Sequence, residues 1–127
     1  MIGHTMQLTS RERVRRAFER EPTDRFPIDL GAHLSTGISA FAYAELRRHL
    51  GLAEKPIRIV DPVQFLAWID DDVLERFHCD VRILRAPWRQ TASWTPRGSQ
   101  AFEIPSTMRP IRQADGCLLY TSPSPRD

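Results

Sequence analysis

RFPIDLGAHLSTGISAFAYAELRRHLG, residues 25–51, places a strand-like pattern directly before a helix-like one. Its first six residues alternate apolar with polar or turn-forming side chains, the apolar ones being Phe26, Ile28 and Leu30. Alternation with a period of two is typical of a β-strand, and the glycine that follows suits a strand that enters a loop. The pattern therefore predicts the first strand of the chain over residues 25–30.

The second half of this stretch has the spacing of an α-helix. Its apolar residues fall on one helical face, namely Ile38, Phe41, Ala42, Leu46 and Leu50. Ser35 or Thr36 can serve as the N-cap, and Gly51 provides a C-terminal stop. We predict a helix over residues 36–50, so that the whole stretch forms one strand–helix unit.

A short amphipathic helix is predicted upstream of this unit, in LTSRERVRRAFERE (8–21). Thr9 stands three residues before Glu12, which is the spacing of a capping box. The arginines of this segment alternate with glutamates, which favours a solvated face with ion pairs over an RNA-binding face. Pro22 ends the helix.

Two further strands are predicted downstream, over residues 56–60 (PIRIV) and 79–84 (CDVRIL). Between them, Asp61 and Pro62 are a good N-cap and first residue for a helix that starts at VQFLAWI. The aspartates that follow can restart a helix through DDVLERF. From Ala86 the chain carries four prolines and two glycines up to the ADG triplet, which predicts a loop or hairpin. The alternation of helices and strands predicts a parallel sheet with crossover helices.

Composition and charge narrow the class of protein. The chain has 127 residues, enough for one ordinary domain, and 41% of them are hydrophobic, which is typical of a globular protein. Its 18 basic and 16 acidic residues give a net charge of +2, too small an imbalance to gather nucleic acid. No apolar run approaches the roughly 20 residues that span a bilayer, and the N-terminal residues do not resemble a signal peptide. We therefore predict a cytoplasmic protein with no membrane partner and no nucleic-acid partner.

Four sequence blocks follow one another in a familiar order: TSRERV, RFPIDLG, STGISAFAYAELRRHLGL and IRIVDPVQFLAWIDDDVLERFHCDV. Over residues 9–115 the chain resembles the N-terminal part of the uroporphyrinogen decarboxylase superfamily, and is most similar to its corrinoid (methylcobamide) methyltransferase-like members. The resemblance implies a TIM (β/α)8 barrel with the N-terminal helix lying across it. Since such a barrel takes about 250 residues, we expect an α/β fold truncated after about three βα units.

Chemistry in a TIM barrel lies on the loops that follow the C-terminal ends of the strands. Six residues at such positions form the predicted substrate cleft: Asp29, Gly31, His33, Ser35, Asp61 and Arg85. A carboxylate and an imidazole at one mouth could perform general acid–base work or hold a polar substrate. Two structural alternatives stay open, with Asp61 as a helix cap and His33 as a hydrogen-bonding loop residue.

The resemblance also bears on the reaction. Decarboxylases of this superfamily carry an arginine-rich block of the kind RQAGR after the first strand and a catalytic aspartate after a strand resembling the third. This sequence has IDLGAHLSTGI and RILRAPW at those places, so no catalytic residue is assigned. Methyl transfer, or a reaction on an unidentified substrate, is the preferred function, and porphyrin decarboxylation is the alternative. The methyltransferase-like members activate a thiol with zinc held by His and Cys late in the barrel, so zinc and a corrinoid partner are expected only of a full-length parent. His78 and Cys79 are not predicted to bind metal, because neighbouring strand residues point to opposite faces.

The last eleven residues, CLLYTSPSPRD (117–127), resemble the translation of a transposase-based sequencing adapter. We therefore expect a partial barrel over residues 1–116, followed by a non-native tail without regular structure. Without the tail Cys79 is the only cysteine, which excludes an internal disulfide and fits a reducing compartment. A truncated barrel exposes a sheet edge and apolar surface, so the chain expressed alone should be poorly soluble and inactive.

A nucleic-acid-binding module is the alternative from another class of function. A small arginine-rich module could stack nucleic-acid bases on Trp88 and Trp94. The nearly balanced charge argues against such a module, because electrostatic attraction to phosphates supplies much of the affinity for nucleic acid.

Overall fold

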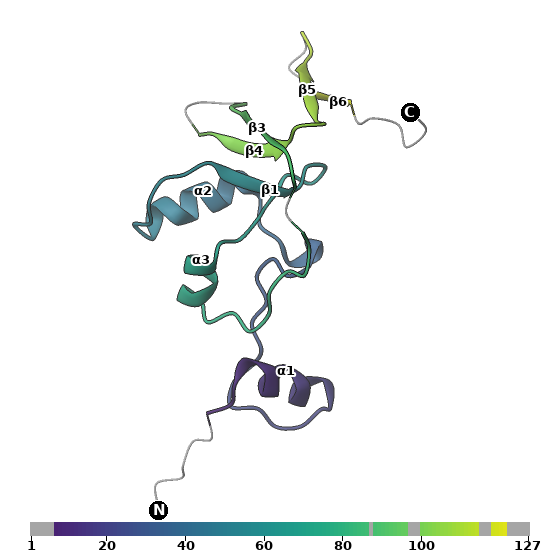
Figure 1. Cartoon of the computed structure of the whole chain (residues 1–127). Coiled ribbons are helices and arrows are strands. Elements are labelled where there is room, and N and C mark those ends of the chain that lie inside the picture. Colours follow the sequence, from purple (N-terminus) through teal and green to yellow (C-terminus); the bar gives the residue numbers. More distant parts are fainter. Residues whose placement is uncertain (1–6, 87, 97–99, 115–117, 122–127) are drawn as a thin grey trace, which may run out of the picture.

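The computed structural model describes residues 7–86, 88–96, 100–114 and 118–121. In chain order these ranges contain α1 (Ser10–Phe18), the 3₁₀ helix η1 (Leu34–Thr36), α2 (Ala40–His49), β1 (Ile57–Asp61), β2 (Leu66–Ala67), α3 (Asp71–Arg76), β3 (Thr91–Trp94), β4 (Phe102–Pro105), β5 (Arg109–Arg112) and β6 (Leu118–Thr121). The molecule is elongated, with α1 at one end and the β5–β6 pair at the other (Figure 1). Every helix in the described ranges is too short or too polar to span a bilayer.

Four strands form a mixed sheet in the order β2-β1-β4-β3. The central strands β1 and β4 are parallel, with Ile57 opposite Phe102, whereas β2 and β3 pair antiparallel with them. Helix α2 packs against β1 and β2 (Figure 1). The architecture is therefore mixed α/β, as the sequence predicted, but only one parallel pair occurs among the described strands.

The strands predicted over 25–30 and 79–84 are wrong, because both segments are extended but neither joins a ladder. They are linked by one backbone hydrogen bond, from the Asp80 N–H to the Ile28 carbonyl (2.8 Å). The Ile28 N–H donates to the Asp80 side chain (2.9 Å) and not to a backbone carbonyl. A strand ladder needs repeated hydrogen bonds between backbone groups, and here the Asp80 carboxylate takes the Ile28 N–H that such a ladder would use.

The helix predicted after Asp61 is also wrong. The Asp61 carboxylate accepts hydrogen bonds from the N–H groups of Val63 (2.8 Å) and Gln64 (3.3 Å), as an N-cap would. The chain then reaches Phe65, whose φ of +55° is incompatible with a right-handed helix, and returns as β2 beside β1. The Phe65 ring packs against Phe102 at 5.0 Å, so burial of this side chain favours the turn. The helix predicted to restart at the aspartates is confirmed as α3.

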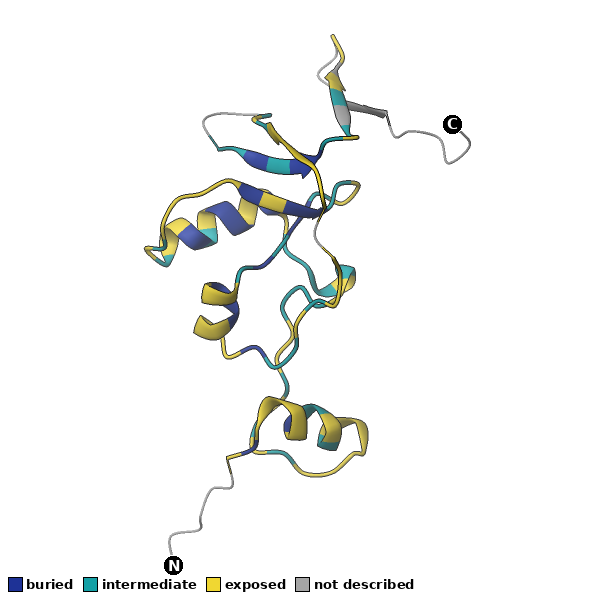
Figure 2. Cartoon of the chain, in the orientation of Figure 1, coloured by how far each residue is buried: buried dark blue, intermediate teal, exposed yellow. Residues whose placement is uncertain are grey.

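The buried face of α2 overlaps only in part with the one that the apolar pattern predicted, since Ile38 and Leu46 pack against the core but are only half-buried. The buried residues of this helix are Ala40, Tyr43, Ala44 and Arg47, at the helical spacing i, i+3, i+4 and i+7. Phe41, which was predicted on the buried face, is 43% exposed. The opposing buried side chains come from β1 and β4 and include Ile57, Ile59, Phe102 and Ile104 (Figure 2). Two of the four buried helix positions carry polar groups, which is why a hydrophobicity pattern did not find this face.

The capping box predicted at the start of α1 is confirmed. The Glu12 N–H donates to Thr9 Oγ1 (3.3 Å), and the Glu12 carboxylate accepts from the Thr9 N–H (3.0 Å). These two bonds satisfy donors that a helix N-terminus otherwise leaves without partners.

The chain from residue 86 forms hairpins, as predicted, and one of them corrects the prediction for the tail. Residues 118–121, which were expected to lack regular structure, form β6 antiparallel to β5, with Arg109 opposite Thr121. The Leu-Leu-Tyr-Thr run is rich in residues that favour strands, and β5 offers it an edge to pair with. Residues 117 and 122–127 lie outside the described residues.

Candidate functional site

The loop after the first extended segment holds four of the six predicted cleft residues, and it is closed by its own hydrogen bonds. Asp29 Oδ1 accepts from the Ala32 N–H (2.9 Å), and the Gly31 N–H donates to the Thr36 carbonyl (3.0 Å). Gly31 has φ +79°, and a Cβ at this position would lie 2.7 Å from Cγ1 of Ile69. Glycine is therefore the residue that fits this close approach, and the loop is fixed against the chain after β2.

His33 and Ser35 are in direct contact at the exposed side of this loop. His33 Nδ1 lies 2.7 Å from Ser35 Oγ, and it also accepts from the Ser35 N–H (3.2 Å), which makes the imidazole the N-cap of η1. Nδ1 is thus engaged within the loop, and Nε2 is the ring nitrogen that this capping contact leaves to other partners. The His33 side chain thus has a hydrogen-bonding role within the loop, one of the two roles that the sequence left open.

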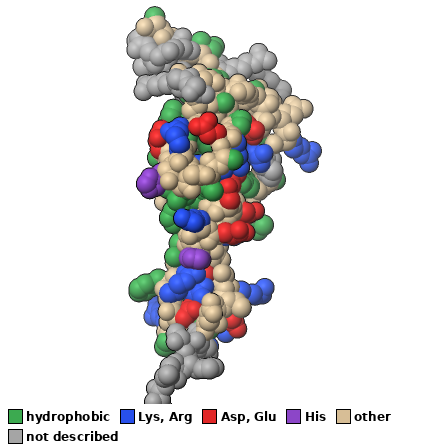
Figure 3. Space-filling model, turned by 90° about the vertical axis from the view of Figure 1, so that its left-hand side faces the viewer, with side chains coloured by type: hydrophobic (Ala, Val, Ile, Leu, Met, Phe, Trp, Pro, Cys, Tyr) green, Lys and Arg blue, Asp and Glu red, His purple; other side chains and the backbone are tan. Residues whose placement is uncertain are grey.

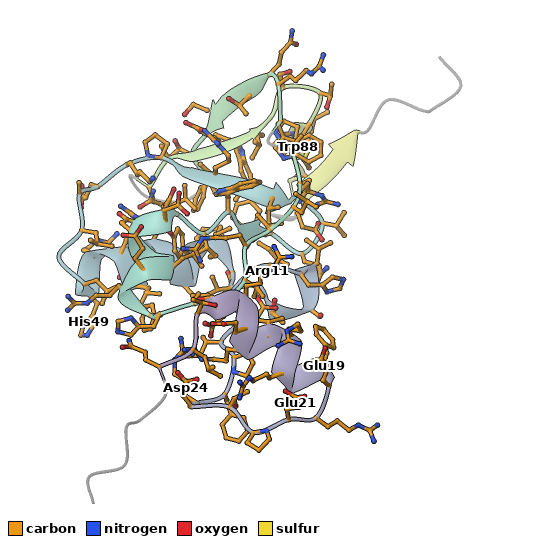
Figure 4. All side chains as sticks on the ribbon, turned by 60° about the horizontal axis from the view of Figure 1, so that its bottom comes forward. Arg11, Glu19, Glu21, Asp24, His49 and Trp88 are labelled. Carbon is orange, nitrogen blue, oxygen red and sulfur yellow. The ribbon has the colours of Figure 1, made fainter. Side chains whose placement is uncertain are left out.

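Asp61 and Arg85 lie at the C-terminal end of β1. Arg85 Nη1 donates to the Val60 carbonyl (3.3 Å), and the indole Nε1 of Trp88 donates to the Ile59 carbonyl (3.0 Å). Trp88 is at the sheet end of the molecule, far from Asp24 beside α1 (Figure 4). The segment after residue 84 is thereby tied to the end of the strand that Asp61 completes.

By their hydrogen bonds, the six candidates fall into two groups within the described ranges. The loop group borders β2, because the Ala67 N–H donates to the Ile38 carbonyl (3.0 Å) and the Ala40 N–H to the Phe65 carbonyl (2.9 Å). The second group borders the end of β1, and the two strands are joined by the turn that Asp61 caps. Within the described ranges, no hydrogen bond or ion pair links a side chain of one group to a side chain of the other.

A buried ionic cluster that the sequence did not predict joins α1 to the rest of the chain. We call it the ionic clasp and define it as Arg13, Asp24, Arg25 and Asp80. The Arg13 side chain is 5% exposed and pairs with Asp24 (2.7 Å) and with Asp80, whose own side chain is 0% exposed. Arg25 pairs with the same Asp80 carboxylate at 2.7 Å. The sequence pattern predicted that the arginines of α1 lie on a solvated face, and this prediction is wrong for Arg13, because its side chain is buried.

The clasp fixes the charge of its two aspartates. Burial of Asp80 opposes ionisation, but hydrogen bonds from Arg25, the Ile28 amide and Arg13 outweigh it and lower the pKa of Asp80 to about 2. The hydrogen bond from Arg13 also holds the pKa of Asp24 well below its usual range. Both carboxylates are therefore ionised at neutral pH, each beside a guanidinium.

A second buried polar cluster ties α2 to the start of α3. Arg47 Nη1 donates to Asp70 (3.1 Å) and to Asp72 (2.9 Å), and the Tyr43 hydroxyl donates to Asp70 (2.8 Å). Lys55 Nζ reaches the other oxygen of Asp70 at 2.6 Å. Burial raises the pKa of Tyr43 to about 12, and the Arg47 hydrogen bond lowers the pKa of Asp72. Both terminal nitrogens of Arg47 have acceptors, whereas its Nε is buried without a hydrogen-bond partner among the described residues. The ion pairs join two helices, which is a structural role.

The described residues offer no ready metal or thiolate chemistry. Across the described ranges, no three His, Cys, Asp or Glu side chains converge as metal ligands would. Cys79 is buried, and that burial raises the pKa of its thiol, which disfavours the thiolate that a metal or a nucleophilic reaction requires.

The chain matches no protein-family model, no curated protein and no solved structure with which it was compared.

Proposed function

We propose that this chain is the N-terminal part of an enzyme of the uroporphyrinogen decarboxylase superfamily, from the branch that transfers methyl groups with a corrinoid partner or acts on another small molecule. The ordered sequence blocks motivate the proposal. The structural observation that supports it is the gathering of Asp61, Arg85 and Trp88 at the C-terminal end of β1, since barrel enzymes collect their chemistry at that end of their strands.

The exposed side chain of Leu84 supports the barrel in this proposal. It lies fully exposed on the segment predicted as the third strand, as expected of a surface that further barrel strands would cover. The hydrogen bonds of Arg25 with the His78 carbonyl (3.0 Å) and of Ile28 with Asp80 join the first and third predicted strands, whereas neighbouring strands of a barrel follow one another in the chain, so these contacts do not add to that support.

Porphyrin decarboxylation is the second candidate within the same superfamily. It requires cationic side chains that pair with the carboxylates of the substrate, and the loop after residue 28 presents no arginine or lysine between Asp29 and Ser39. The Arg85 guanidinium near β1 already donates to a backbone carbonyl. Methyl transfer, or a reaction on a less acidic small molecule, fits these residues better.

The described residues do not fit the zinc site of the methyltransferase-like members. Cys79 is buried with a raised thiol pKa, and the preceding His78 has φ +52°, which is a left-handed backbone conformation. In this proposal the zinc ligands and the corrinoid-binding surface come from the part of the parent enzyme that follows residue 116.

Nucleic-acid binding is not favoured by the surface. Among the described residues, eight arginines form ion pairs with carboxylates: Arg13, Arg15, Arg16, Arg25, Arg47, Arg48, Arg58 and Arg82. Basic and acidic side chains are interspersed on the face in Figure 3. Trp94 packs edge-on against Phe65 at 5.5 Å, and Trp88 donates its indole N–H within the chain. The rings expected to stack on bases thus have partners inside the protein.

The test is to recover the gene downstream of codon 116 from an independent DNA read and to express the complete protein. We expect further strand–helix units, transfer of a methyl group between a methylcorrinoid and a thiol, and no release of carbon dioxide from uroporphyrinogen. Arg85→Met should lower kcat/KM by about tenfold, which corresponds to about 1.4 kcal/mol of transition-state binding. The matched Arg48→Met, on the exposed face of α2, should leave it unchanged. A continuation without strand–helix units, or decarboxylation without methyl transfer, would reject the proposal.

A further inference from the structure

Helix α1 lies outside the apolar core of the chain. None of its residues belongs to the cluster of buried apolar side chains, and Phe18 at its end is 85% exposed. Arg13 is its buried residue. Figure 1 shows α1 beyond the main body, and Figure 2 shows its surface as largely exposed. Hydrophobic burial therefore contributes little to holding this helix in place.

Charged hydrogen bonds across the ionic clasp take the place of that burial. Arg13 donates to both oxygens of Asp24 (2.7 and 2.8 Å), to the Leu8 carbonyl (2.7 Å) and to Asp80. The first two partners belong to the same N-terminal segment, so the bond to Asp80 is the one that crosses to the rest of the chain. Asp80 in turn accepts from Arg25 at 2.7 and 3.0 Å. The fully buried Asp80 carboxylate is thus the common anchor of two arginines from the N-terminal segment.

A cleft of about 410 Å³ lies along this junction, between the start of α1 and the chain around α3. Its walls include Ser10, Arg13, Glu75, His78 and Cys79. Cys79 is only 7% exposed while α1 is in place. Separation of α1 from this wall would widen the cleft and give solvent access to the thiol.

We propose that residues 7–24 form a strap that opens as one unit, independently of the β-sheet core, and that the Asp80 carboxylate holds it closed. Proteins open in cooperative units whose free energies range from near zero up to that of global unfolding, and elements with few apolar contacts open first. Loss of one partner from a buried ion pair leaves an uncompensated charge, which favours the open state. Cys79 lies in the cleft wall that faces the strap, so opening of the strap increases the access of solvent to the side of the thiol that the core does not cover.

The test compares Asp80→Asn with the matched Asp71→Asn, whose side chain is 81% exposed and pairs with Arg82. Amide hydrogen exchange is followed in α1 and in β1 of the whole chain, together with the rate at which a disulfide reagent labels Cys79. For Asp80→Asn we expect α1 exchange and Cys79 labelling to rise about a hundredfold or more, with β1 exchange changed less than about threefold. Asp71→Asn should change none of the three. Unchanged α1 exchange in Asp80→Asn would overturn the proposal.

A second variant decides the case in which Asp80→Asn unfolds the whole chain. Arg13→Lys keeps the charge but removes the planar, multiply donating guanidinium, so it should raise α1 exchange and Cys79 labelling by about tenfold. Arg15→Lys, at a 58% exposed side chain of the same helix, is its control. Joint acceleration of α1 and β1 exchange in Arg13→Lys would show that the strap and the core open together, which contradicts the proposal.

Discussion

Phe102→Ala is expected to remove the centre of the core. Phe102 is 0% exposed, lies opposite Ile57 in the parallel pair, and its ring meets those of Phe41 and Phe65 at 5.0 Å. Truncation of a buried phenylalanine costs about 3–5 kcal/mol, and each edge-to-face ring pair contributes about 0.5–1.5 kcal/mol beyond burial. Because two ring pairs are lost, we expect a loss near the upper end, about 4–5 kcal/mol. Net domain stability is only about 5–15 kcal/mol, so the variant should unfold at little or no denaturant.

The assay is a urea titration at low protein concentration, followed by tryptophan fluorescence. Trp94 is a suitable reporter because its ring packs edge-on against Phe65, within the same aromatic cluster. Phe18→Ala is the matched control, since that ring is 85% exposed on α1 and its removal should change stability by less than about 0.5 kcal/mol. A loss of less than about 1 kcal/mol for Phe102→Ala, or equal losses for the two variants, would refute the assigned core.

Three further outcomes are expected. In an alkaline absorbance titration, Tyr43 should ionise near pH 12, and ionisation at about pH 10 would contradict its burial. Because the pKa of the folded state is raised, the stabilisation is complete below about pH 10 and is lost as the pH rises toward 12. Tyr43→Phe should be tolerated, but with weaker anchoring of Asp70. In acid, the lowered pKa of Asp80 means that its contribution to stability is present above about pH 4 and is lost as the pH falls through about 2. Amide exchange in α1 should therefore accelerate between pH 4 and pH 2. Exchange that stays constant over this range, after correction for the intrinsic rate, would argue against the clasp. Gly31→Ala should destabilise the chain by about 1–3 kcal/mol in thermal or urea unfolding, because position 31 combines φ +79° with a 2.7 Å approach of a Cβ to Ile69. Gly51→Ala should cost less, because position 51 has a positive φ but open space around it. Equal losses of stability in the two variants would contradict the close packing of the loop.

Local signals in the sequence predicted the local structure well. The Thr9–Glu12 capping box, the helix ending before Gly51 and the strand predicted over 56–60, which is β1, all depend on residues within a few positions of one another. Propensity and capping act over that range, so they can be read from one segment at a time.

Long-range structure was predicted less well, for a physical reason that differs from place to place. The helix expected after Asp61 gave way because burial of the Phe65 ring among other aromatic rings favours a turn. The buried face of α2 was missed because Tyr43 and Arg47 bury polar groups that find partners far away in sequence, at Asp70 and Asp72. Nothing local to these residues reveals such partners.

The candidate site shows the same division. Asp61 was selected as the end of a predicted strand, and it is the last residue of β1. Arg85 was selected because it follows residues 79–84, which are not a strand, and it reaches β1 through its bond to the Val60 carbonyl. These positions did not reveal that the loop with His33 borders β2, since that depends on the turn at Phe65. The ionic clasp was missed because Arg13 and Asp80 are separated by most of the folded chain.

The parallel pairing of β1 with β4 also fixes when the protein can fold during its synthesis. Ile57 meets Phe102 across this pair, so the two strands are 45 positions apart in the chain. At roughly 5–20 residues per second, a ribosome adds the intervening residues in a few seconds. Until β4 emerges, the parts of α2 and β1 that pack against Phe102 and Ile104 stay uncovered, and that interval is when a nascent chain of this sequence most needs a chaperone.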